Sequence, residues 1–328
     1  MRTMKNTGIQ KFLALGALLI LIIFFSIFGY KFATFETAIN ILDKSYFIGF
    51  LAIGVTFVII TGGIDLSIGA VMMCSALIGG IAYNVWALPM WLCLIIMVSV
   101  GLAFGLINGI LISKLKLPPF IATLGTMMIS MGLASIISNV QTQRFPQQAD
   151  ADGWFKTVFF KTPGNLIDGG GLPTGVLYLG IFFVIAFIVL NRTKIGRYIF
   201  AIGSNEEAVR LSGVKADFWK MLAYTISGLF AGLSSIVYAA TYSTIIPGTG
   251  NGLELEAIAA VVIGGTSLSG GVGSLSGTII GVLIMSTLKT GLVSMNLPPY
   301  WQTFFTGIVV IAAVLMDIYR NKKSRSLA

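Results

Sequence analysis

The decapeptide TGGIDLSIGA (residues 61–70) decides how this chain folds, because it sets a carboxylate and a glycine pair inside an apolar region. The apolar stretches FIGFLAIGVTFVII and VMMCSALIGGIAY flank it on either side. Glycine costs about 1 kcal/mol inside a helix and readily adopts the helix-terminating conformation, so Gly62 and Gly63 are expected to end a short helix. Asp65 is then expected to cap the next helix by accepting hydrogen bonds from its unpaired N–H groups.

Two interpretations of this break follow from the cost of polar groups in a membrane. Irregular backbone at membrane depth is tolerated only where protein buries it or where it lines water. An aspartate at the centre of a span costs roughly 3 kcal/mol on insertion scales, so it needs a polar neighbour or a cavity. Asp65 therefore lies either beside a translocation path or its inner gate, or at the cytoplasmic boundary as a plain helix cap, and the two roles are compatible.

The composition of the 328-residue chain places it in a membrane, since 56% of its residues are hydrophobic and only 10% are charged. Soluble domains carry roughly a quarter of charged residues. Apolar runs of about 18 residues or more are long enough to cross a bilayer as helices, and the alternating pattern of a membrane barrel is absent. The predicted fold is an all-α membrane protein in which residues 1–328 form a single polytopic domain.

The residue types in the chain exclude several classes of function. Histidine is absent, and the two cysteines, Cys74 and Cys93, lie in apolar runs without metal spacing. These facts exclude His-based triads and most zinc sites, and they predict no metal site, no cofactor in this chain and no enzymatic activity. The net charge of +9 does not indicate nucleic-acid binding, because the basic residues cluster beside apolar runs, where they set topology.

Ten membrane spans are expected, of which the first is an uncleaved span. Their approximate positions are residues 11–30, 47–61, 67–84, 89–113, 119–140, 174–190, 218–240, 254–264, 273–293 and 302–319. If the N-terminus is cytoplasmic, the basic clusters fall on the inner side of the membrane and the outer loops are near neutral. Both termini are therefore expected to be cytoplasmic.

Two pairs of similar segments predict an internal repeat. Glycine recurs at every fourth position in the fourth and ninth spans, at Gly101, Gly105 and Gly109 and at Gly273, Gly277 and Gly281. This spacing lets another helix backbone approach closely. The sequences LPPFIATLGT (117–126) and LPPYWQTFFT (297–306) then open the fifth and tenth spans. A repeat of five helices inverts its second copy, so residues 1–145 and 172–320 are expected to be inverted halves with broken helices and a substrate site between them.

A further similarity, between GGIDLSIG (62–69) and GGTSLSGG (264–271), is one helix out of register with this repeat. Both segments are expected to break a helix. Asn108, in the first glycine ladder, is more typical of an interhelical hydrogen bond than of a ligand. The candidate residues for the path or gate are Gly62, Gly63, Asp65, Ser67, Asn108, Gly264, Gly265, Ser267 and Ser269.

The inner loop at 191–217 contains a short helix signal. Ser204 and Glu207 match the capping box S-x-x-E and predict a helix over residues 205–212, after which Asp217 can cap the next span. Such a short helix is unstable alone in water. It is therefore expected to dock against the spans or against another protein.

Other polar and aromatic residues suggest structural roles. Glu254 and Glu256 suit the first turn of the eighth span, where the helix dipole favours acids. Lys289 is expected to snorkel or to form an ion pair. The outer segment 141–172 interleaves Trp and Phe with polar residues, a pattern typical of a helix lying on the membrane or of a docking site for an external partner.

Three motifs carry a resemblance to a known family. They are VTFVIITGGIDLSIGAV (55–71), GRYIFAIGSNEEAVRLSGV (196–214) and ELEAIAAVVIGGTSLSGGVGSLSGT (254–278). With them, nearly the whole chain resembles the permease subunits of bacterial ABC importers for simple sugars, of the ribose, xylose and galactose type. The resemblance implies a multi-pass protein of the bacterial inner membrane that imports a monosaccharide.

The resemblance also implies partners. These are cytoplasmic ATP-binding subunits, a second permease chain that is identical or related, an external sugar-binding protein and the surrounding membrane lipid. The family's coupling helix, which docks into the ATPase, corresponds to residues 205–213, where the usual Ala-Ala pair is Ala208-Val209. The implied contact residues are Gly203, Asn205, Glu206, Glu207, Ala208, Arg210, Ser212 and Gly213.

Two other classes of function remain as alternatives. The chain has no G-x-x-x-x-G-K-[ST] phosphate loop, so it cannot bind ATP by that route. An ion-gradient-driven secondary transporter of a small polar solute would need paired ionisable groups at membrane depth. Asp65 is the only clear candidate, and no basic partner for it is apparent. An integral membrane enzyme is disfavoured because no His, metal cluster or carboxylate pair is present.

Overall fold

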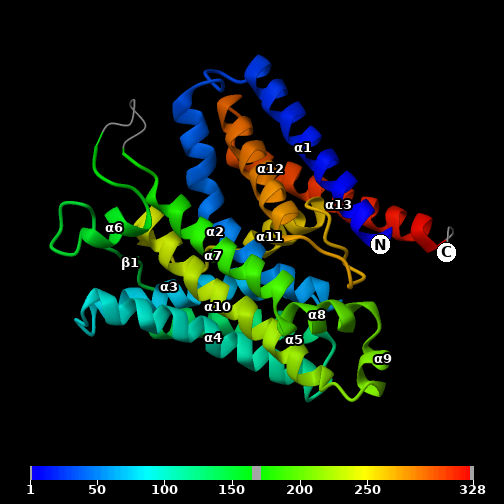
Figure 1. Ribbon diagram of the computed structural model, residues 1–328. Coiled ribbons are helices and arrows are strands. Elements are labelled where there is room, and N and C mark those ends of the chain that lie inside the picture. The colour runs from blue at the N-terminus through cyan, green and yellow to red at the C-terminus, as the bar shows by residue number, and fades with distance from the viewer. Residues whose placement is uncertain (1, 165–170, 326–328) are drawn as a thin grey trace.

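The computed structural model of the chain describes residues 2–164 and 171–325, and most of these residues are helical (Figure 1). The helices are α1 (Arg2–Phe28), α2 (Phe35–Ile60), α3 (Ile68–Asn84), α4 (Met90–Ser113), α5 (Pro119–Ser138), α6 (Trp154–Phe159), α7 (Thr174–Arg192), α8 (Lys194–Ser204), α9 (Glu206–Leu211), α10 (Ala216–Tyr242), α11 (Leu253–Ile263), α12 (Leu275–Ser294) and α13 (Pro299–Arg325). Two short strands, β1 (Gln143–Arg144) and β2 (Thr244–Ile245), pair antiparallel. The predicted all-α membrane fold is confirmed.

Each expected span coincides with one helix, but the helices differ in length. Among the described residues, eight are long and apolar enough to cross a membrane: α1, α2, α4, α5, α7, α10, α12 and α13. Helix α3 has 17 residues and α11 has 11. At 1.5 Å per residue α11 covers about 16 Å, roughly half of the hydrocarbon core. The expectation of ten full crossings is therefore too simple, because α11 is too short to cross by itself.

Helix α2 is longer than the sequence indicated. It begins at Phe35 instead of residue 47, because the Thr34 hydroxyl caps it by accepting a hydrogen bond from the Thr37 N–H at 3.3 Å. Asp43, in the part of α2 that was not expected to be helical, is neutralised by Lys161 of the segment after α6, with 2.8 Å between Oδ2 and Nζ. The 26-residue α2 is the central helix. In its apolar 18-residue stretch 89% of the residues are buried, against 11% in the corresponding stretches of α1 and α13.

The two glycine ladders lie where helices approach closely, as predicted. In α4, Gly105 lies against the backbone of Gly228 in α10. In α12, Gly277 and Gly281 lie against the backbone of α11, at Gly264 and Ala260. Small residues allow the two backbones to approach closely. The resulting van der Waals contact stabilises the helix pair, because the hydrophobic effect does not drive helices together within lipid.

Several contacts between helices occur in corresponding pairs. Helix α4 packs on α10 as α12 packs on α2, and α3 packs on α5 and α10 as α11 packs on α13 and α2. These pairs are equivalent if α7, α10, α11, α12 and α13 repeat α1 to α5. Helices α1 and α7 break the pairing, because α1 packs on α12 whereas α7 packs on α2.

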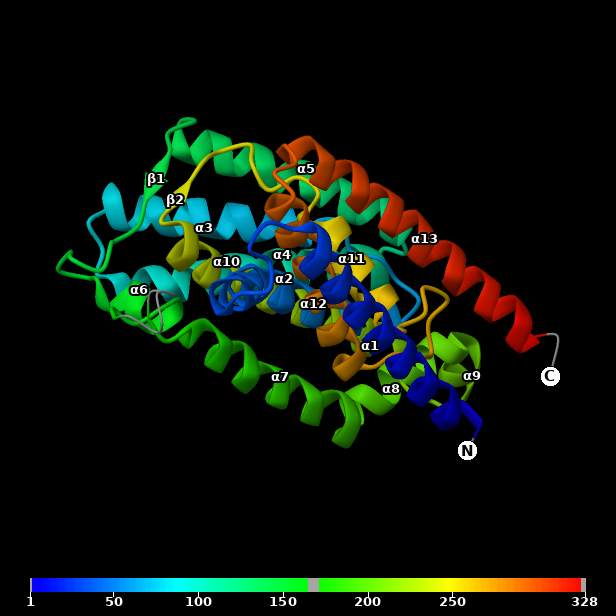
Figure 2. The same ribbon diagram turned by 90° about the horizontal axis from the view of Figure 1, so that it is seen from above.

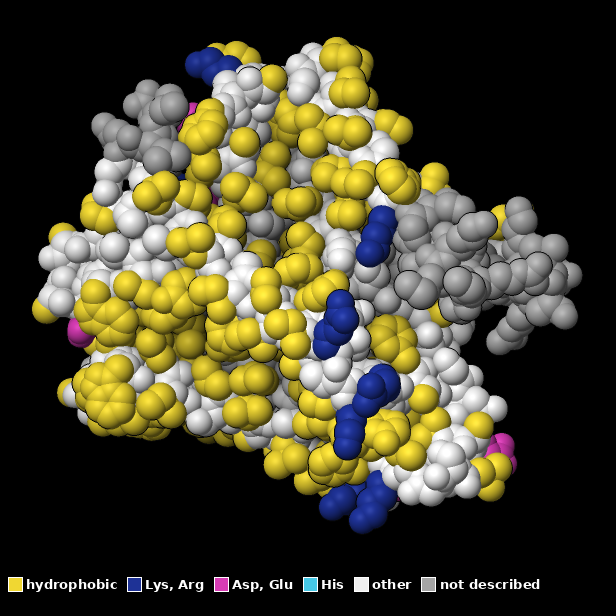
Figure 3. Space-filling view, in the orientation of Figure 1, with side chains coloured by type: hydrophobic (Ala, Val, Ile, Leu, Met, Phe, Trp, Pro, Cys, Tyr) yellow, Lys and Arg dark blue, Asp and Glu magenta, His cyan; other side chains and the backbone are white. Residues whose placement is uncertain are grey.

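The molecule has two distinct ends. Figure 2 shows the N-terminal end of α1, the C-terminal end of α13, α8 and α9 at one end, and β1, β2 and α6 at the other. Hydrophobic side chains cover most of the face in Figure 3, as expected for a surface in contact with lipid. Arg192, Lys194 and Arg197 are exposed at the end that carries α8.

The expected interfacial helix in the segment 141–172 is only the six-residue α6. Its Phe155 is fully buried and stacks on Phe145 with ring centroids 5.6 Å apart, while Trp154 is exposed. The aromatic residue Phe155 therefore packs in the protein core, and α6 does not lie with one complete face against the membrane.

Candidate functional site

The break between α2 and α3 has the predicted glycine end but not the predicted cap. Helix α2 ends at Ile60, and Gly62 adopts a left-handed conformation with φ of 78° that favours glycine. Helix α3 begins at Ile68 with Ser67 as its N-cap, so the expectation that Asp65 caps α3 is wrong. The Asp65 carboxylate instead accepts from the Ser67 N–H at 3.0 Å, the Ser67 hydroxyl at 2.7 Å and the Ser227 hydroxyl at 2.8 Å.

Asp65 belongs to a buried chain of polar side chains. Asn108 Nδ2 donates to Ser67 Oγ at 2.8 Å, and Thr126 Oγ1 donates to Asn108 Oδ1 at 2.6 Å. The chain joins the break to α4, α5 and α10, and its members are at most 2% exposed. Hydrogen bonds to the carboxylate offset the cost of its burial. Among the described residues no Lys or Arg forms an ion pair with Asp65.

The second break, between α11 and α12, uses a carboxylate that sequence reasoning missed. Helix α11 ends at Ile263, Gly264 is its C-cap and Gly265 has a φ of 96°. The Asp317 carboxylate, from α13, accepts from Ser267 Oγ at 3.2 Å and from the Leu268 N–H at 3.0 Å. Asp317 lies inside the expected span 302–319, where an isolated acidic residue is the signal that could have identified it.

The Ser267 hydroxyl also shapes its own turn, because it accepts from the Ser269 N–H at 3.2 Å. The two similar motifs thus share a design. Each break surrounds a buried carboxylate with serine hydroxyls and backbone N–H groups, but the first motif supplies its own aspartate and the second takes one from α13.

The two breaks also touch each other, which explains why both motifs contain glycine pairs. The Gly271 N–H donates to the Ile60 carbonyl at 2.9 Å. Gly203, in α8, lies against both, so that a methyl group at this position would overlap the Ile60 carbonyl oxygen and the Gly271 nitrogen. We call Ile60, Gly62, Gly203, Gly270 and Gly271 the glycine junction. It brings the ends of α2 and α8 into direct backbone contact with the segment between α11 and α12.

Helix α9 is the short inner helix expected between the sixth and seventh spans. It covers six residues instead of eight, and Asn205, not Ser204, is its N-cap, accepting from the Ala208 N–H at 2.9 Å. Ser204 closes α8 and donates to the Phe200 carbonyl. The expected capping box is absent because Ser204 is the last residue of α8, so the cap of α9 moves to Asn205. Gly213, with a φ of 81°, follows the helix as expected.

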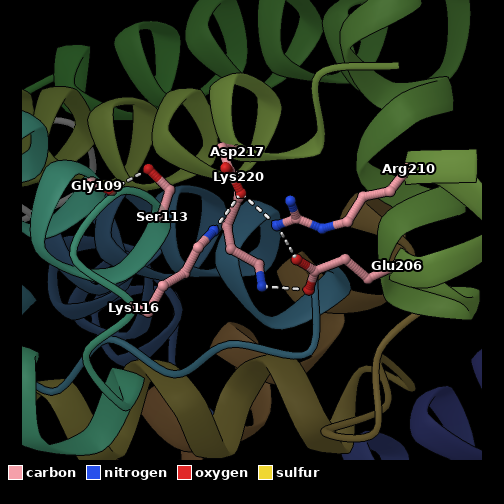
Figure 4. A network of polar contacts seen from close by, with 7 residues as sticks. All are labelled: Gly109, Ser113, Lys116, Glu206, Arg210, Asp217 and Lys220. Atoms are coloured by element: carbon pink, nitrogen blue, oxygen red, sulfur yellow. Dashed lines mark hydrogen bonds and ion pairs between the residues drawn. The ribbon is translucent and has the colours of Figure 1, made fainter. Parts of the chain in front are cut away.

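An ion-pair network holds α9 against the bundle (Figure 4). Glu206 pairs with Arg210 at 2.8 Å and with Lys220 of α10 at 2.6 Å. Asp217 pairs with Arg210 and, at 2.6 Å, with Lys116 of the α4–α5 turn. Asp217 therefore does not cap α10, whose N-cap is Lys215.

The network keeps Glu206 ionised. Burial alone would raise the pKa of the Glu206 carboxyl, but hydrogen bonds from Lys220 and Arg210, together with their charges, hold the pKa below its usual value of 4.5. Both partners are partly exposed, so each pair stabilises the protein modestly. Five linked charges nevertheless hold α9 against α10 and the α4–α5 turn.

The remaining side chains of α9 divide into an inner and an outer set. Val209 is buried against Ile202 and Ala216, so the β-branched residue at the Ala-Ala position packs inside this chain. Glu207, Ala208, Ser212 and Gly213 are exposed. Leu211 is 84% exposed and was not among the expected contacts. Leu211 therefore adds an apolar side chain to the exposed side of α9.

The described residues contain no group of three or more His, Cys, Asp or Glu side chains that could hold a metal ion. The candidate site therefore consists of the two helix breaks, the glycine junction that joins them and α9 beside it.

Comparisons with known proteins give the family. Residues 37–314 match the family model described as the permease component of the branched-chain amino acid transport system. The chain is 38% identical over 315 residues to the ribose import permease protein RbsC of Escherichia coli (strain K12), covering 94% of this chain and 93% of that protein.

Two further relatives are similar along almost their whole length. The ribose import permease protein RbsC of Bacillus subtilis (strain 168) is 38% identical, covering 94% of this chain and 91% of that protein. The xylose transport system permease protein XylH of Escherichia coli (strain K12) is 31% identical, covering 98% and 95%. No solved structure matches the chain. A helical bundle with two helix breaks and similarity to transport permeases over more than 90% of the chain lead to one assignment: the chain belongs to the family of transport-system permease components that this model describes.

Proposed function

We propose that the chain is the membrane-spanning permease subunit of an ATP-driven importer of a monosaccharide in a bacterial inner membrane. The observation that carries the proposal is the similarity to ribose and xylose permeases over more than 90% of both chains. The permease is not an enzyme. Because the sequence has no phosphate loop, hydrolysis of ATP takes place in separate cytoplasmic subunits.

The exposed side of α9 is the proposed docking site for the ATP-binding subunits. Glu207, Ala208, Leu211 and Ser212 point away from the bundle, whereas Glu206 and Arg210 bind α9 to α10. Movement of the docked subunit is passed from α9 to α8, and from Gly203 to the end of α2 and the segment between α11 and α12. Backbone contacts transmit small displacements without the slack of side chains.

The helix breaks form the proposed inner gate of the translocation path. In this conformation Asp65, Ser67 and Asn108 are fully packed, so we assign them to a joint that holds the gate closed rather than to contact with the solute. The turn from Gly264 to Ser269 is the opposing part of the gate. Alternating access requires that the helices at the gate exchange between two discrete packing arrangements. A broken helix whose polar groups keep their hydrogen bonds can move between such arrangements.

The remaining partners follow from the two ends of the molecule. The basic residues exposed beside α8 support a cytoplasmic position for that end and for both termini. An external sugar-binding protein then meets the end that carries β1, β2 and α6. A second permease chain completes the pore, lipid covers the apolar outer faces, and residues 1–145 and 172–320 are the two inverted halves.

Reconstitution tests the proposal. The permease, its ATP-binding subunits and the binding protein are reconstituted together in proteoliposomes. We expect uptake of ribose or xylose only when ATP is present on the side of the membrane that carries the ATP-binding subunits. Uptake that continues without those subunits and stops with an uncoupler would favour an ion-driven carrier. One observation favours this second candidate, namely the ion pair between Lys289 and Glu256, with 2.5 Å between Nζ and Oε1, inside the bundle.

A further inference from the structure

A cavity of about 610 Å³ lies among α10, α11, α12 and α13. Tyr238 near the end of α10, the 250–252 turn before α11 and Pro299 at the start of α13 contribute to its wall, so it lies toward the end of the molecule that carries β2. Its volume is within the range of small-molecule sites. The cavity is separate from the helix breaks and from α9.

The ion pair that α11 and α12 form lies in the wall of this cavity. The side chains of Lys289 and Glu256 are 19% and 9% exposed. An ion pair within a membrane-spanning bundle carries a large desolvation cost, so such pairs commonly mark solute pathways. The low exposure of both side chains distinguishes this pair from a surface anchor, although Glu256 lies in the first turn of α11.

Two polar atoms in the cavity wall have no hydrogen-bond partner among the described residues. Glu256 Oε2 and the Thr306 hydroxyl are buried, and neither has a hydrogen-bond partner there. Both residues line the cavity and are more than nine-tenths buried. A buried polar atom without a partner costs about 1–3 kcal/mol, so its retention needs a reason.

The other polar residues of the wall define the chemistry that would satisfy these groups. Asn251, Gln302 and Thr303 add neutral donors and acceptors, and Tyr238 adds an aromatic ring. The charges of Glu256 and Lys289 cancel, which disfavours an anion or a cation. Adjacent hydroxyl groups donate to a carboxylate and accept from an ammonium at the same time.

We propose that this cavity binds a neutral, polyhydroxylated solute of the monosaccharide class as it enters the permease, with Glu256 and Lys289 as its main hydrogen-bonding residues. The proposal deepens the proposed function and rests on it. It gives the permease a solute contact of its own, on the side that receives the sugar from the binding protein, and it gives the ion pair a role in an importer that ATP drives.

Protection of an introduced thiol tests the site directly. Both native cysteines are buried, so Thr303→Cys supplies an accessible thiol in the cavity wall, and Thr142→Cys supplies a control at the same end but outside the cavity. In the complete importer, saturating ribose or xylose is expected to slow labelling of Thr303→Cys by a charged maleimide at least fivefold and to leave Thr142→Cys unchanged. Equal labelling with and without sugar overturns the site, as does labelling by lipid-soluble reagents alone, which would make the cavity a lipid site.

A pair of substitutions separates solute contact from stability. Glu256→Gln is expected to raise the sugar concentration for half-maximal uptake about tenfold, with ATP hydrolysis retained. The control is Asp43→Asn, which removes the other ion pair of similar burial, Asp43 with Lys161, and is expected to leave that concentration unchanged. An equal effect of both substitutions overturns the proposal. ATP-dependent uptake by the unmodified importer in the same vesicles reports the proposed function independently, so that either claim can fail alone.

Discussion

At the scale of single residues, Asp65 shows how a carboxylate can be buried in a membrane protein without a cation. Three hydrogen bonds from Ser67 and Ser227 surround its two oxygens. Hydrogen bonds to a charged group contribute roughly 1.5–3 kcal/mol each, which offsets its desolvation. The aspartate thereby ties the 61–67 break to α10 and, through Ser67, to Asn108.

Replacing Asp65 should therefore separate transport from folding. Asp65→Ala is expected to lower uptake about tenfold or more, a loss of about 1.4 kcal/mol or more in the transport step, while the amount of inserted protein stays within about twofold. Ser227→Ala, which removes a single hydrogen bond, serves as the control and is expected to lower uptake by less than about threefold. Uptake by Asp65→Ala at the level of the unmodified protein would show that the aspartate is dispensable.

Gly203 allows a second test at this scale. Gly203→Ala places a methyl group on two backbone atoms of neighbouring elements, at Ile60 and Gly271, and backbone cannot move aside as a side chain can. We expect ATP hydrolysis to continue while uptake falls, since the glycine junction is forced apart. The matched control is Gly180→Ala in α7, where an added methyl group meets nothing within 4 Å. Coupled uptake in Gly203→Ala would contradict transmission through the junction.

At the scale of elements, α9 combines an anchored inner side with an exposed outer side. Leu211→Asp is expected to reduce co-purification of the ATP-binding subunits about tenfold, because it places a charge in the proposed interface. Val85→Asp, at another exposed apolar residue but at the opposite end, is the control and should retain them. Normal co-purification of Leu211→Asp would exclude the outer side of α9 as the docking site.

The pH dependence of α9 follows from the lowered pKa of Glu206. A carboxyl whose pKa is lower in the folded state stabilises the fold above its unfolded pKa, and this contribution is lost as the pH falls through the folded pKa. Amide hydrogen exchange of α9 should therefore be constant from neutral pH down to the usual value of 4.5 and should accelerate only below it, after correction for intrinsic rates. Accelerated exchange already near pH 6 would show that another group holds the helix.

At the scale of the whole molecule, the charge distribution predicts orientation. Glu207→Cys is expected to react with a membrane-impermeant maleimide only from the cytoplasmic side, and Thr142→Cys only from the outside, since α9 and β1 lie at opposite ends (Figure 2). Both native thiols are buried and should stay silent. Labelling of both variants from the same side would overturn the proposed topology.

The parts of this site that could be predicted are those whose structure depends on residues adjacent in sequence. Gly62, Gly63 and the 264–271 turn were recognisable because glycine pairs inside apolar runs end helices. The cap at Asn205 was missed because Ser204 and Asn205 are both good caps, and only the length of α8 selects between them. Asp317 was missed because its partners, Ser267 and Leu268, lie 50 and 49 residues away in sequence.

The sequence by itself determined the membrane location, the order of the long apolar helices and the places where α2 and α11 end. These follow from composition and from the rule that backbone in lipid must satisfy its own hydrogen bonds. Only the tertiary structure decided that the two breaks meet at Gly203, that Lys289 pairs with Glu256 and that Glu206 and Arg210 form ion pairs with α10. The physical reason is that a helix is specified by neighbouring residues, whereas a buried polar pair is specified by how distant helices pack.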